Sequence, residues 1–405
     1  MPRRLCQPDG AAEMPPARSL PVRLPAPRVL LLWIAGTVGV LAAGGLLFAW
    51  SGIYNVAASS GHFAITRAFL TFGLHSSVRT HSIGIEVPPL GGPDLVRLGA
   101  GHFAGGCAPC HGAPGEPRNP MMDSMLPPPP RLSDAVGDWE TRELFWIVKH
   151  GLKYTAMPAW VALPRDDEVW AVIAFLRQLP GLSAEDYRTL ANFDAAEGSV
   201  AEPHGRSTFL EALAACARCH GDANSAPTSH LVPKLAGQSP AYMQSALRHY
   251  ASGMRFSGIM QPVAALLDEA AIERFSQYYA ALDAVGGEAA DESSPGEEIE
   301  RGRSIATAGV PEAGIPPCLS CHGDRAADIF PRLQNQNAPY ILTQLRLFKQ
   351  GNRGLTATAA IMQAIARRLT DRQMQDTAAY FESLPGARQG ELAEEASAAA
   401  EAPSP

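Results

Sequence analysis

The chain has 405 residues, which is enough for several domains, and a formal net charge of −7 at pH 7. This mildly acidic balance argues against a nucleic-acid partner. Six of its 7 cysteines lie in three Cys-x-x-Cys-His motifs and the last, Cys6, lies near the N-terminus, so no spare pair remains for structural disulfides.

The first predicted element is an apolar stretch of 22 residues without a charge, at 29–50, long enough to span the hydrocarbon core of a bilayer. Arginines precede it, and no Lys or Arg follows it before Arg67. By the positive-inside rule we expect a cytoplasmic tail at 1–28, a single-pass anchor in a bacterial inner membrane, and a periplasmic remainder. A cleaved signal peptide is the alternative, with "NVAAS" at 55–59 as its cleavage region, although the apolar core of such a peptide is usually about 7–15 residues.

Residues 51–92 are expected to form a juxtamembrane segment and linker. The run "HFAITRAFLTFGL", which begins at His62, predicts an amphipathic helix near the membrane surface. We interpret His62, His75 and His81 as solvated or packed side chains rather than metal ligands. The Pro- and Gly-containing "EVPPLGGPDL" ends the segment as a linker.

The first Cys-x-x-Cys-His motif begins at Cys107, and the same spacing returns at Cys216 and Cys318. This run is the attachment signature of c-type haem: the thiols bind the porphyrin as thioethers, and the histidine reaches the iron. A tetrahedral zinc site would need a second pair of ligands within about 12–20 residues, and a thioredoxin-like site would need a βαβ setting. Neither surrounds these motifs. We therefore expect three covalently bound haem c groups, held by Cys107, Cys110, Cys216, Cys219, Cys318 and Cys321.

The first haem domain is expected at 93–190. The run "DDEVWAVIAFLRQL" predicts its closing helix, because it starts with acidic residues and places apolar residues on one face. His111 is the expected proximal iron ligand. Met157, in a loop before the closing helix, is the expected distal ligand, with His150 as the alternative.

The segments "GCAPCHGAPG", "FWIVKHGLKYTAMPAW" and "DEVWAVIAFLRQLP" resemble the monohaem class I cytochromes c of the cbb3-subunit type. The resemblance covers this whole domain and implies an α-helical haem-binding fold.

Residues 204–283 and 297–386 are expected to be two copies of one haem domain. Tyr242 matches Tyr340 at an offset of 98 residues, and Met260 matches Met362 at an offset of 102, so the copies differ by gaps in loops. Such repetition predicts homologous domains in tandem. A predicted closing helix follows each methionine, and Thr370 with Gln373 forms a capping-box pattern at the start of the second.

Each copy carries one methionine 44 residues after its first motif cysteine. The expected axial pairs are therefore His220 with Met260 and His322 with Met362. Met254 is the alternative to Met260, and Met374 is expected to be a core residue.

The shared "CHG", "P-x-L-x-x-Q" and "G-x-R" signals and the final methionine resemble the dihaem cytochromes c4, in which two such domains stand face to face. Ala246 replaces the family's Gln, and "VPEAGIPP" is inserted before Cys318. Neither departure touches an expected ligand, so only the geometry between the two haems is put in doubt.

The chain is thus expected to be all-α, with one N-terminal transmembrane helix followed by three cytochrome c domains. The polar, acidic stretch between the second and third domains is expected to be flexible. The Ala-, Glu- and Pro-rich tail at 387–405 is expected to be disordered.

A His/Met pair leaves no open position on a haem iron, so the expected role is electron transfer rather than enzymatic catalysis. We expect a membrane-anchored trihaem cytochrome that carries single electrons in a periplasmic respiratory chain, to or within a terminal cytochrome oxidase. Redox proteins and the membrane are its expected partners. The alternatives are a cytochrome subunit of a periplasmic alcohol or sugar dehydrogenase and a c-type peroxidase, which would need a haem without its methionine.

Overall fold

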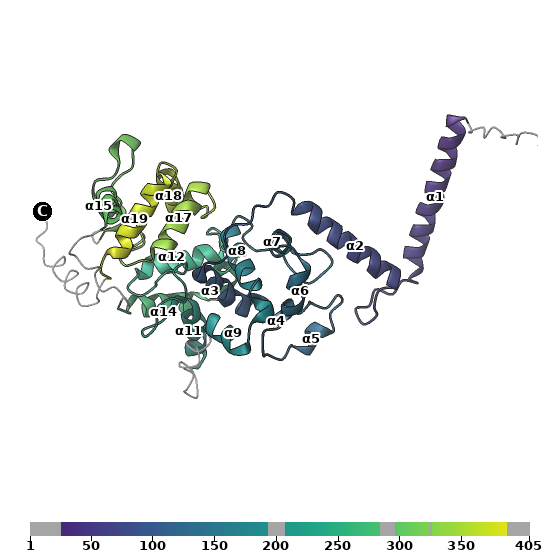
Figure 1. Cartoon of the computed structure of the whole chain (residues 1–405), viewed down its shortest axis with the longest axis horizontal. Coiled ribbons are helices and arrows are strands. Elements are labelled where there is room, and N and C mark those ends of the chain that lie inside the picture. The colour runs from purple at the N-terminus through teal and green to yellow at the C-terminus, as the bar shows by residue number, and fades with distance from the viewer. Residues whose placement is uncertain (1–25, 193–206, 284–295, 324–325, 387–405) are drawn as a thin grey trace, which may run out of the picture. The chain divides into compact units, whose positions relative to one another are not determined.

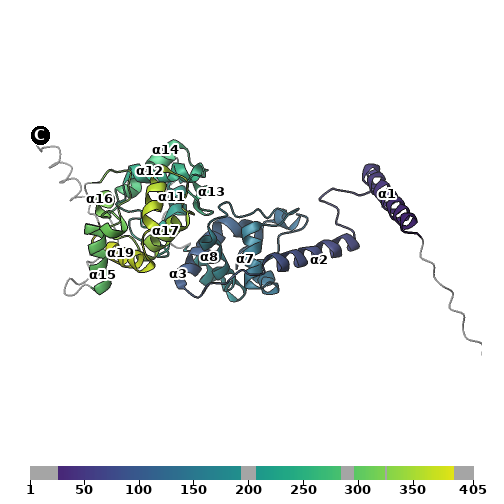
Figure 2. The ribbon, with the colours of Figure 1, turned by 90° about the horizontal axis from the view of Figure 1, so that it is seen from above.

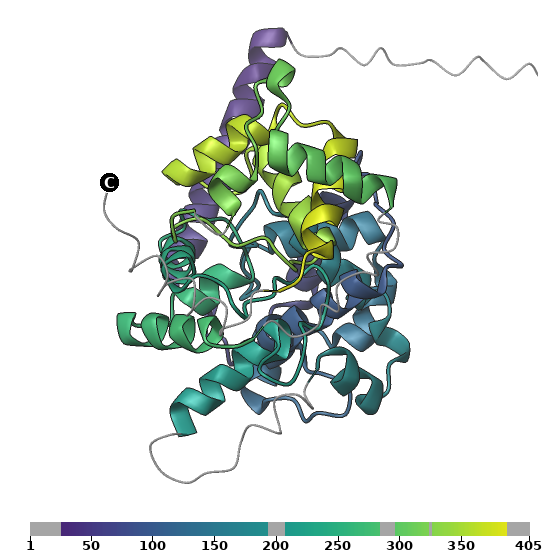
Figure 3. The ribbon, with the colours of Figure 1, turned by 90° about the vertical axis from the view of Figure 1, so that its left-hand side faces the viewer.

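The computed structural model describes residues 26–192, 207–283, 296–323 and 326–386. The chain forms two compact units, Met1–Gly61 and His62–Pro405. In the described residues the regular elements are helices, and extended pairing is limited to isolated bridges (Figures 1 and 3). The prediction of an all-α fold is therefore confirmed. The expected flexible stretch between the second and third domains and the expected tail at 387–405 lie wholly or largely outside the described residues.

The first unit contains α1 (Pro27–Ser51), which includes the predicted span at 29–50. Pro27 fits the first turn because its backbone N–H would have no helical partner, and Gly52 ends the helix with a positive φ of 66°. At about 1.5 Å per residue, 25 residues extend about 37 Å. α1 is thus long and apolar enough to cross a membrane, a property that a signal sequence near the N-terminus shares.

The second unit begins with α2 (Ala64–His81). The expected first haem domain follows it, and its α3, α7 and α8 lie together in Figure 2. The elements of this domain are α3 (Pro93–His102), the π-helical η1 (Phe103–Cys107), α4 (Ala108–His111), α5 (Pro120–Asp123), α6 (Leu132–Ala135), the 3-10 turn η2 (Val136–Asp138), α7 (Thr141–His150), α8 (Asp166–Leu176), the 3-10 turn η3 (Leu179–Gly181) and α9 (Ala184–Leu190).

The core of this domain forms where α3 meets α8. A Cβ added at Gly99 would overlap the carbonyl oxygen of Ala171, so only glycine allows this close approach of the two helices. Phe103, Phe175 and Tyr187 pack beside the crossing and are completely buried. This crossing fixes the segment that runs from α3 into the first Cys-x-x-Cys-His motif.

The helix α2 packs against the first haem domain. Val78 is buried, the ring of His75 stacks on Trp139 with centroids 4.5 Å apart, and Arg79 pairs with Glu143 across 3.8 Å. His81 lies against the Trp146 ring, so His75 and His81 are packed, as the sequence indicated. The expected juxtamembrane segment therefore includes a helix attached to the domain that follows it.

The second and third haem domains complete this unit. The second contains α11 (Ser207–His220), α12 (Pro240–Ala251), α13 (Met260–Ala264) and α14 (Glu269–Ala280); the third contains α15 (Glu297–Ala308), the 3-10 turn η4 (Pro311–Ala313), α16 (Leu319–His322), α17 (Ala338–Gln350), α18 (Ala357–Ala366) and α19 (Asp371–Ser383).

The third domain repeats the helix crossing of the first. A Cβ added at Gly302 of α15 would overlap the carbonyl oxygen of Asp376 in α19. The capping box of Thr370 and Gln373 is present at the start of α19, and Met374 is fully buried in the core, as predicted.

Candidate functional site

Each Cys-x-x-Cys-His motif ends a short helix or the last turn of a longer one. His111, His220 and His322 are the last residues of α4, α11 and α16. The turn of helix places both cysteines and the histidine on one segment, as attachment of one planar group requires.

The three motif histidines share one orientation. Each ring places Nδ1 against a proline carbonyl oxygen: His111 with Pro130 at 2.9 Å, His220 with Pro233 at 3.0 Å and His322 with Pro331 at 2.9 Å. A carbonyl can only accept, so Nδ1 must donate, and Nε2 keeps its lone pair for a metal.

The protonation state of these histidines suits a metal ligand. Burial lowers the pKa of each imidazole, and the hydrogen bond to the proline carbonyl opposes this effect only in part. The rings are therefore neutral near pH 7, which is the form that binds iron.

The side chains around the motif cysteines do not form a zinc site. Burial raises the pKa of the Cys107 thiol to about 12 and that of the Cys216 and Cys318 thiols to about 11. Across the described ranges, no group of three His, Cys, Asp or Glu side chains is placed to hold a metal ion.

A cavity of about 1660 Å³ connects the three motifs. Its lining is mostly apolar and includes His111, His220 and His322 together with Met157, Met260 and Met362. The structure thus brings each expected His and Met pair to the same cavity.

The alternative ligands have different surroundings. His150 is exposed, its ring lies tilted against Trp146 with centroids 5.3 Å apart, and it does not line this cavity. Met254 does line the cavity, but its side chain is 38% exposed, whereas Met260 is half-buried at the first residue of α13.

Two buried arginines test whether haem fits this cavity. Arg255 and Arg353 line it and are only 7% and 8% exposed, and within the described residues neither has a carboxylate partner. Arg255 donates to the hydroxyls of Tyr242 and Tyr340 at 3.2 and 3.3 Å, and both Nε atoms lack an acceptor. Buried cations normally have a counter-charge. The propionate carboxylates of haem would supply one, so the residues present fit this group.

The glutamines of the two "P-x-L-x-x-Q" segments join the second and third domains. Gln238 donates to the carbonyl of Arg332 and accepts from its N–H at 3.0 and 2.9 Å. Gln336 does the same with Lys234, at 3.0 and 2.9 Å. The repeat predicted their equivalence, but the sequence did not show that each glutamine binds the backbone of the other copy.

Two protein families match parts of the chain. The family described as "Cytochrome C oxidase, cbb3-type, subunit III" matches residues 94–176, and the family "Cytochrome c" matches residues 299–385. The thiosulfate dehydrogenase electron acceptor of Thiomonas intermedia (strain K12) is 33% identical over 175 residues, which cover 42% of this chain and 79% of that protein.

Cytochrome c4 of Pseudomonas aeruginosa is 30% identical over 176 residues, 42% of this chain and 84% of that protein. A solved cytochrome c4 structure from Acidithiobacillus ferrooxidans is 35% identical, covers 42% of this chain and 98% of that one, and has a TM-score of 0.37. With its helical fold and its Cys-x-x-Cys-His motifs, the chain belongs to the c-type cytochromes, electron carriers with covalently bound haem c, and combines a cbb3-type monohaem domain with a cytochrome c4-like part.

Proposed function

We propose that this chain is a three-haem electron carrier, held at the bacterial inner membrane by α1, with its haem domains in the periplasm. The observation that carries the proposal is the repeated histidine: in each of the three motifs its Nδ1 is bound to a proline carbonyl, and all three rings line one mostly apolar cavity that Met157, Met260 and Met362 also line. The axial pairs are His111 with Met157, His220 with Met260 and His322 with Met362. The thioether cysteines are those of the three motifs.

The protein side chains determine what the haem can do. Haem c supplies a one-electron redox centre when bound. The proline carbonyls orient the histidine rings and keep Nε2 available, and the methionine thioethers favour reduced iron and raise its potential. A haem iron held by one of these histidines and one of these methionines would have no position left for a small oxidant, and its domain would then only transfer electrons.

The number of haems is tested by pyridine haemochrome absorbance against protein mass. The fully matured chain should give three haems, and a Cys318→Ala, Cys321→Ala double variant should give two. A count of two or fewer in the unmodified chain would contradict the proposal.

The pathway we propose ends at a terminal cytochrome oxidase, with this chain delivering electrons to the oxidase or acting within it. The match of residues 94–176 to a subunit of cbb3-type oxidase supports this direction. A second candidate is an electron acceptor for a periplasmic dehydrogenase, and the relative named as a thiosulfate dehydrogenase electron acceptor favours thiosulfate over an alcohol or sugar as the oxidised compound.

Oxygen uptake by membranes from a deletion strain separates the two candidates. If the chain serves an oxidase generally, both quinol- and thiosulfate-driven uptake should fall and should recover when the gene is restored. If it accepts electrons from thiosulfate oxidation alone, only thiosulfate-driven uptake should fall. Unchanged uptake with both donors would contradict both candidates.

A further inference from the structure

A buried ion pair in the first haem domain reaches into the second. Arg165 and Glu168, at the start of α8, are 8% and 3% exposed, and Nη1 of Arg165 lies 2.9 Å from Oε1 of Glu168. Asp167 holds the other side of the guanidinium, with Nε and Nη2 donating to its carboxylate at 2.9 and 2.8 Å. Burial of two charges costs free energy unless their remaining hydrogen-bonding groups are satisfied.

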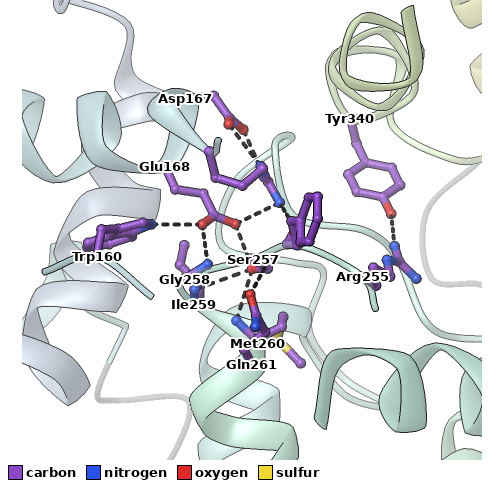
Figure 4. A network of polar contacts seen from close by, with 12 residues as sticks. Trp160, Asp167, Glu168, Arg255, Ser257, Gly258, Ile259, Met260, Gln261 and Tyr340 are labelled. Carbon is purple, nitrogen blue, oxygen red and sulfur yellow. Dashed lines mark hydrogen bonds and ion pairs between the residues drawn. The ribbon is translucent and has the colours of Figure 1, made fainter. Parts of the chain in front are cut away.

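The remaining groups of this pair are satisfied by three consecutive residues of the second domain (Figure 4). Arg165 donates to the carbonyl of Phe256 at 2.7 Å. Ser257, through its hydroxyl, and Gly258, through its backbone N–H, each donate to the Glu168 carboxylate at 2.6 Å. The ion pair therefore fixes both the backbone and a side chain of this loop.

Ser257 also binds the backbone of Met260, so it links Glu168 to the expected ligand. Its hydroxyl oxygen accepts from the backbone N–H of Ile259 at 3.3 Å and from that of Met260 at 3.0 Å. The same hydroxyl proton is directed to Glu168, so one side chain connects the carboxylate to the first residue of α13. A carboxylate acceptor strengthens this hydrogen bond and fixes its direction.

The loop that carries the expected ligand of the first haem touches the same residues. Trp160 lies three positions after Met157, and its indole N–H donates to Glu168 at 3.3 Å. A Cβ added at Gly258 would overlap this indole, so the two loops are in direct contact. The loop after Met157 and the loop before Met260 therefore meet at Glu168.

The third domain positions its methionine differently. Met362 lies within α18, whose first turn is capped by Thr356 accepting from Ala359 N–H at 3.1 Å. Met260 instead is the first residue of α13, and the turn before it is capped by Ser257, whose hydroxyl accepts from the Met260 N–H at 3.0 Å and whose own N–H donates to Gln261 at 3.0 Å. In the second domain the capping residue is itself bound by a side chain of the first domain, because Ser257 donates to Glu168.

The first domain also contacts the Cys-x-x-Cys-His motif of the second domain. A Cβ added at Gly101 would lie 3.4 Å from the Sγ of Cys219, and Asp94 accepts from the backbone N–H of His230 at 2.9 Å. The first domain therefore meets the second at both its motif and its methionine loop.

We propose that Arg165 and Glu168 are positioning residues for the axial methionine of the second haem, so that this haem site is completed by the first domain and the first and second haems form a fixed electron-transfer pair. The proposal rests on the assignment of Met260 as the iron ligand. The contact between Trp160 and Gly258 lies between the two methionine loops and is the expected route of coupling.

The test uses the full-length protein with its haems. Glu168→Ala should remove or weaken the contribution of the second haem to the sulfur–iron(III) charge-transfer band in the oxidised protein, and should shift the midpoint potential of that haem more than that of the first, whose loop reaches Glu168 only through Trp160. Glu168→Gln, which can still accept from Ser257 and Gly258, should retain the band and show a smaller shift of the same haem. Glu185→Gln, which neutralises an exposed acid on α9, is the control and should change neither property.

Ser257→Ala tests the same positioning role in a second way. It removes the hydrogen bonds that connect Glu168 to the Met260 backbone and leaves the ion pair of Arg165 and Glu168 in place. It should shift the same haem as Glu168→Ala. Met260→Ala, measured in parallel, must remove one share of the band; if it does not, the ligand assignment is wrong. If Met260→Ala removes that share while neither Glu168→Ala nor Ser257→Ala changes any potential or the band, the positioning role is overturned and the proposed carrier function stands.

Discussion

At the scale of single residues, the choice between Met157 and His150 depends on their surroundings. Met157 lines the cavity, and its loop is fixed by Thr155, whose hydroxyl accepts from the Met157 N–H at 3.1 Å. We expect Met157→Ala to remove one of the three shares of the sulfur–iron(III) charge-transfer band. His150→Ala should leave the band unchanged because that ring is exposed and lies outside the cavity, against Trp146. The opposite pattern would identify His150 as the ligand.

The buried arginines at the cavity predict an electrostatic effect on redox potential. Arg353 and Arg255 are both buried at this cavity, and burial and the neighbouring charge of Arg255 lower the pKa of Arg353. We expect Arg353→Gln to lower the potential of a nearby haem, because a cation favours the reduced, less positive iron. The change should be on the order of 1–2 kcal/mol at an effective dielectric constant of about 20.

Potentiometric titration measures this shift, and Arg346→Gln is its control because Arg346 is an exposed residue of α17. A rise in potential, or equal shifts in both variants, would mean that Arg353 does not act through its charge at the cavity.

At the scale of helices, the glycine crossings predict where the fold tolerates no side chain. Gly99→Val should separate α3 from α8, because the added atoms overlap the backbone of Ala171 and backbone cannot rotate away. Overpacking of this kind costs about 1–3 kcal/mol, so the midpoint of thermal unfolding should fall by several degrees.

Circular dichroism of the full-length protein measures this midpoint. Gly137→Ala is the control, since a Cβ there has no neighbour within 4 Å. An unfolding midpoint that stays the same for Gly99→Val would contradict the close approach of these helices.

The local elements could be predicted from sequence because their signals are local. Helical periodicity and an acidic first turn indicated α8, and the Thr370–Gln373 pattern indicated the start of α19. The role of Glu168 could not be predicted this way: the sequence indicated only that acidic residues begin the helix, and the fold buries Glu168 under residues from another domain. The packing of α2 could not be predicted from local signals either, because its histidines contact Trp139 and Trp146, which lie far from α2 in the sequence.

At the scale of the second unit, the second haem domain contacts both of its neighbours through different residues. Glu168 and Asp94 of the first domain bind its residues 257–258 and 230, and Gln336 of the third binds Lys234. Within the described residues, the second domain is therefore held to each of its neighbours by hydrogen bonds.

The last prediction concerns α1, because an attached span decides which partners the haem domains can meet. A tethered carrier meets membrane-bound partners at a high effective concentration, which a released carrier does not. α1 has no charged residue beyond Arg28 and leaves its apolar side chains exposed, so screening of charge by salt should not release it. We expect the mature protein to retain residues 29–50, to fractionate with membranes and to require detergent for extraction. Intact mass is the direct measurement, and a variant that lacks residues 1–57 behind a cleavable signal peptide is the soluble control. A natural mature chain that begins near Ala58 and is recovered from the periplasmic fraction would show that α1 is a signal sequence, and the carrier would then have to reach its partners by diffusion.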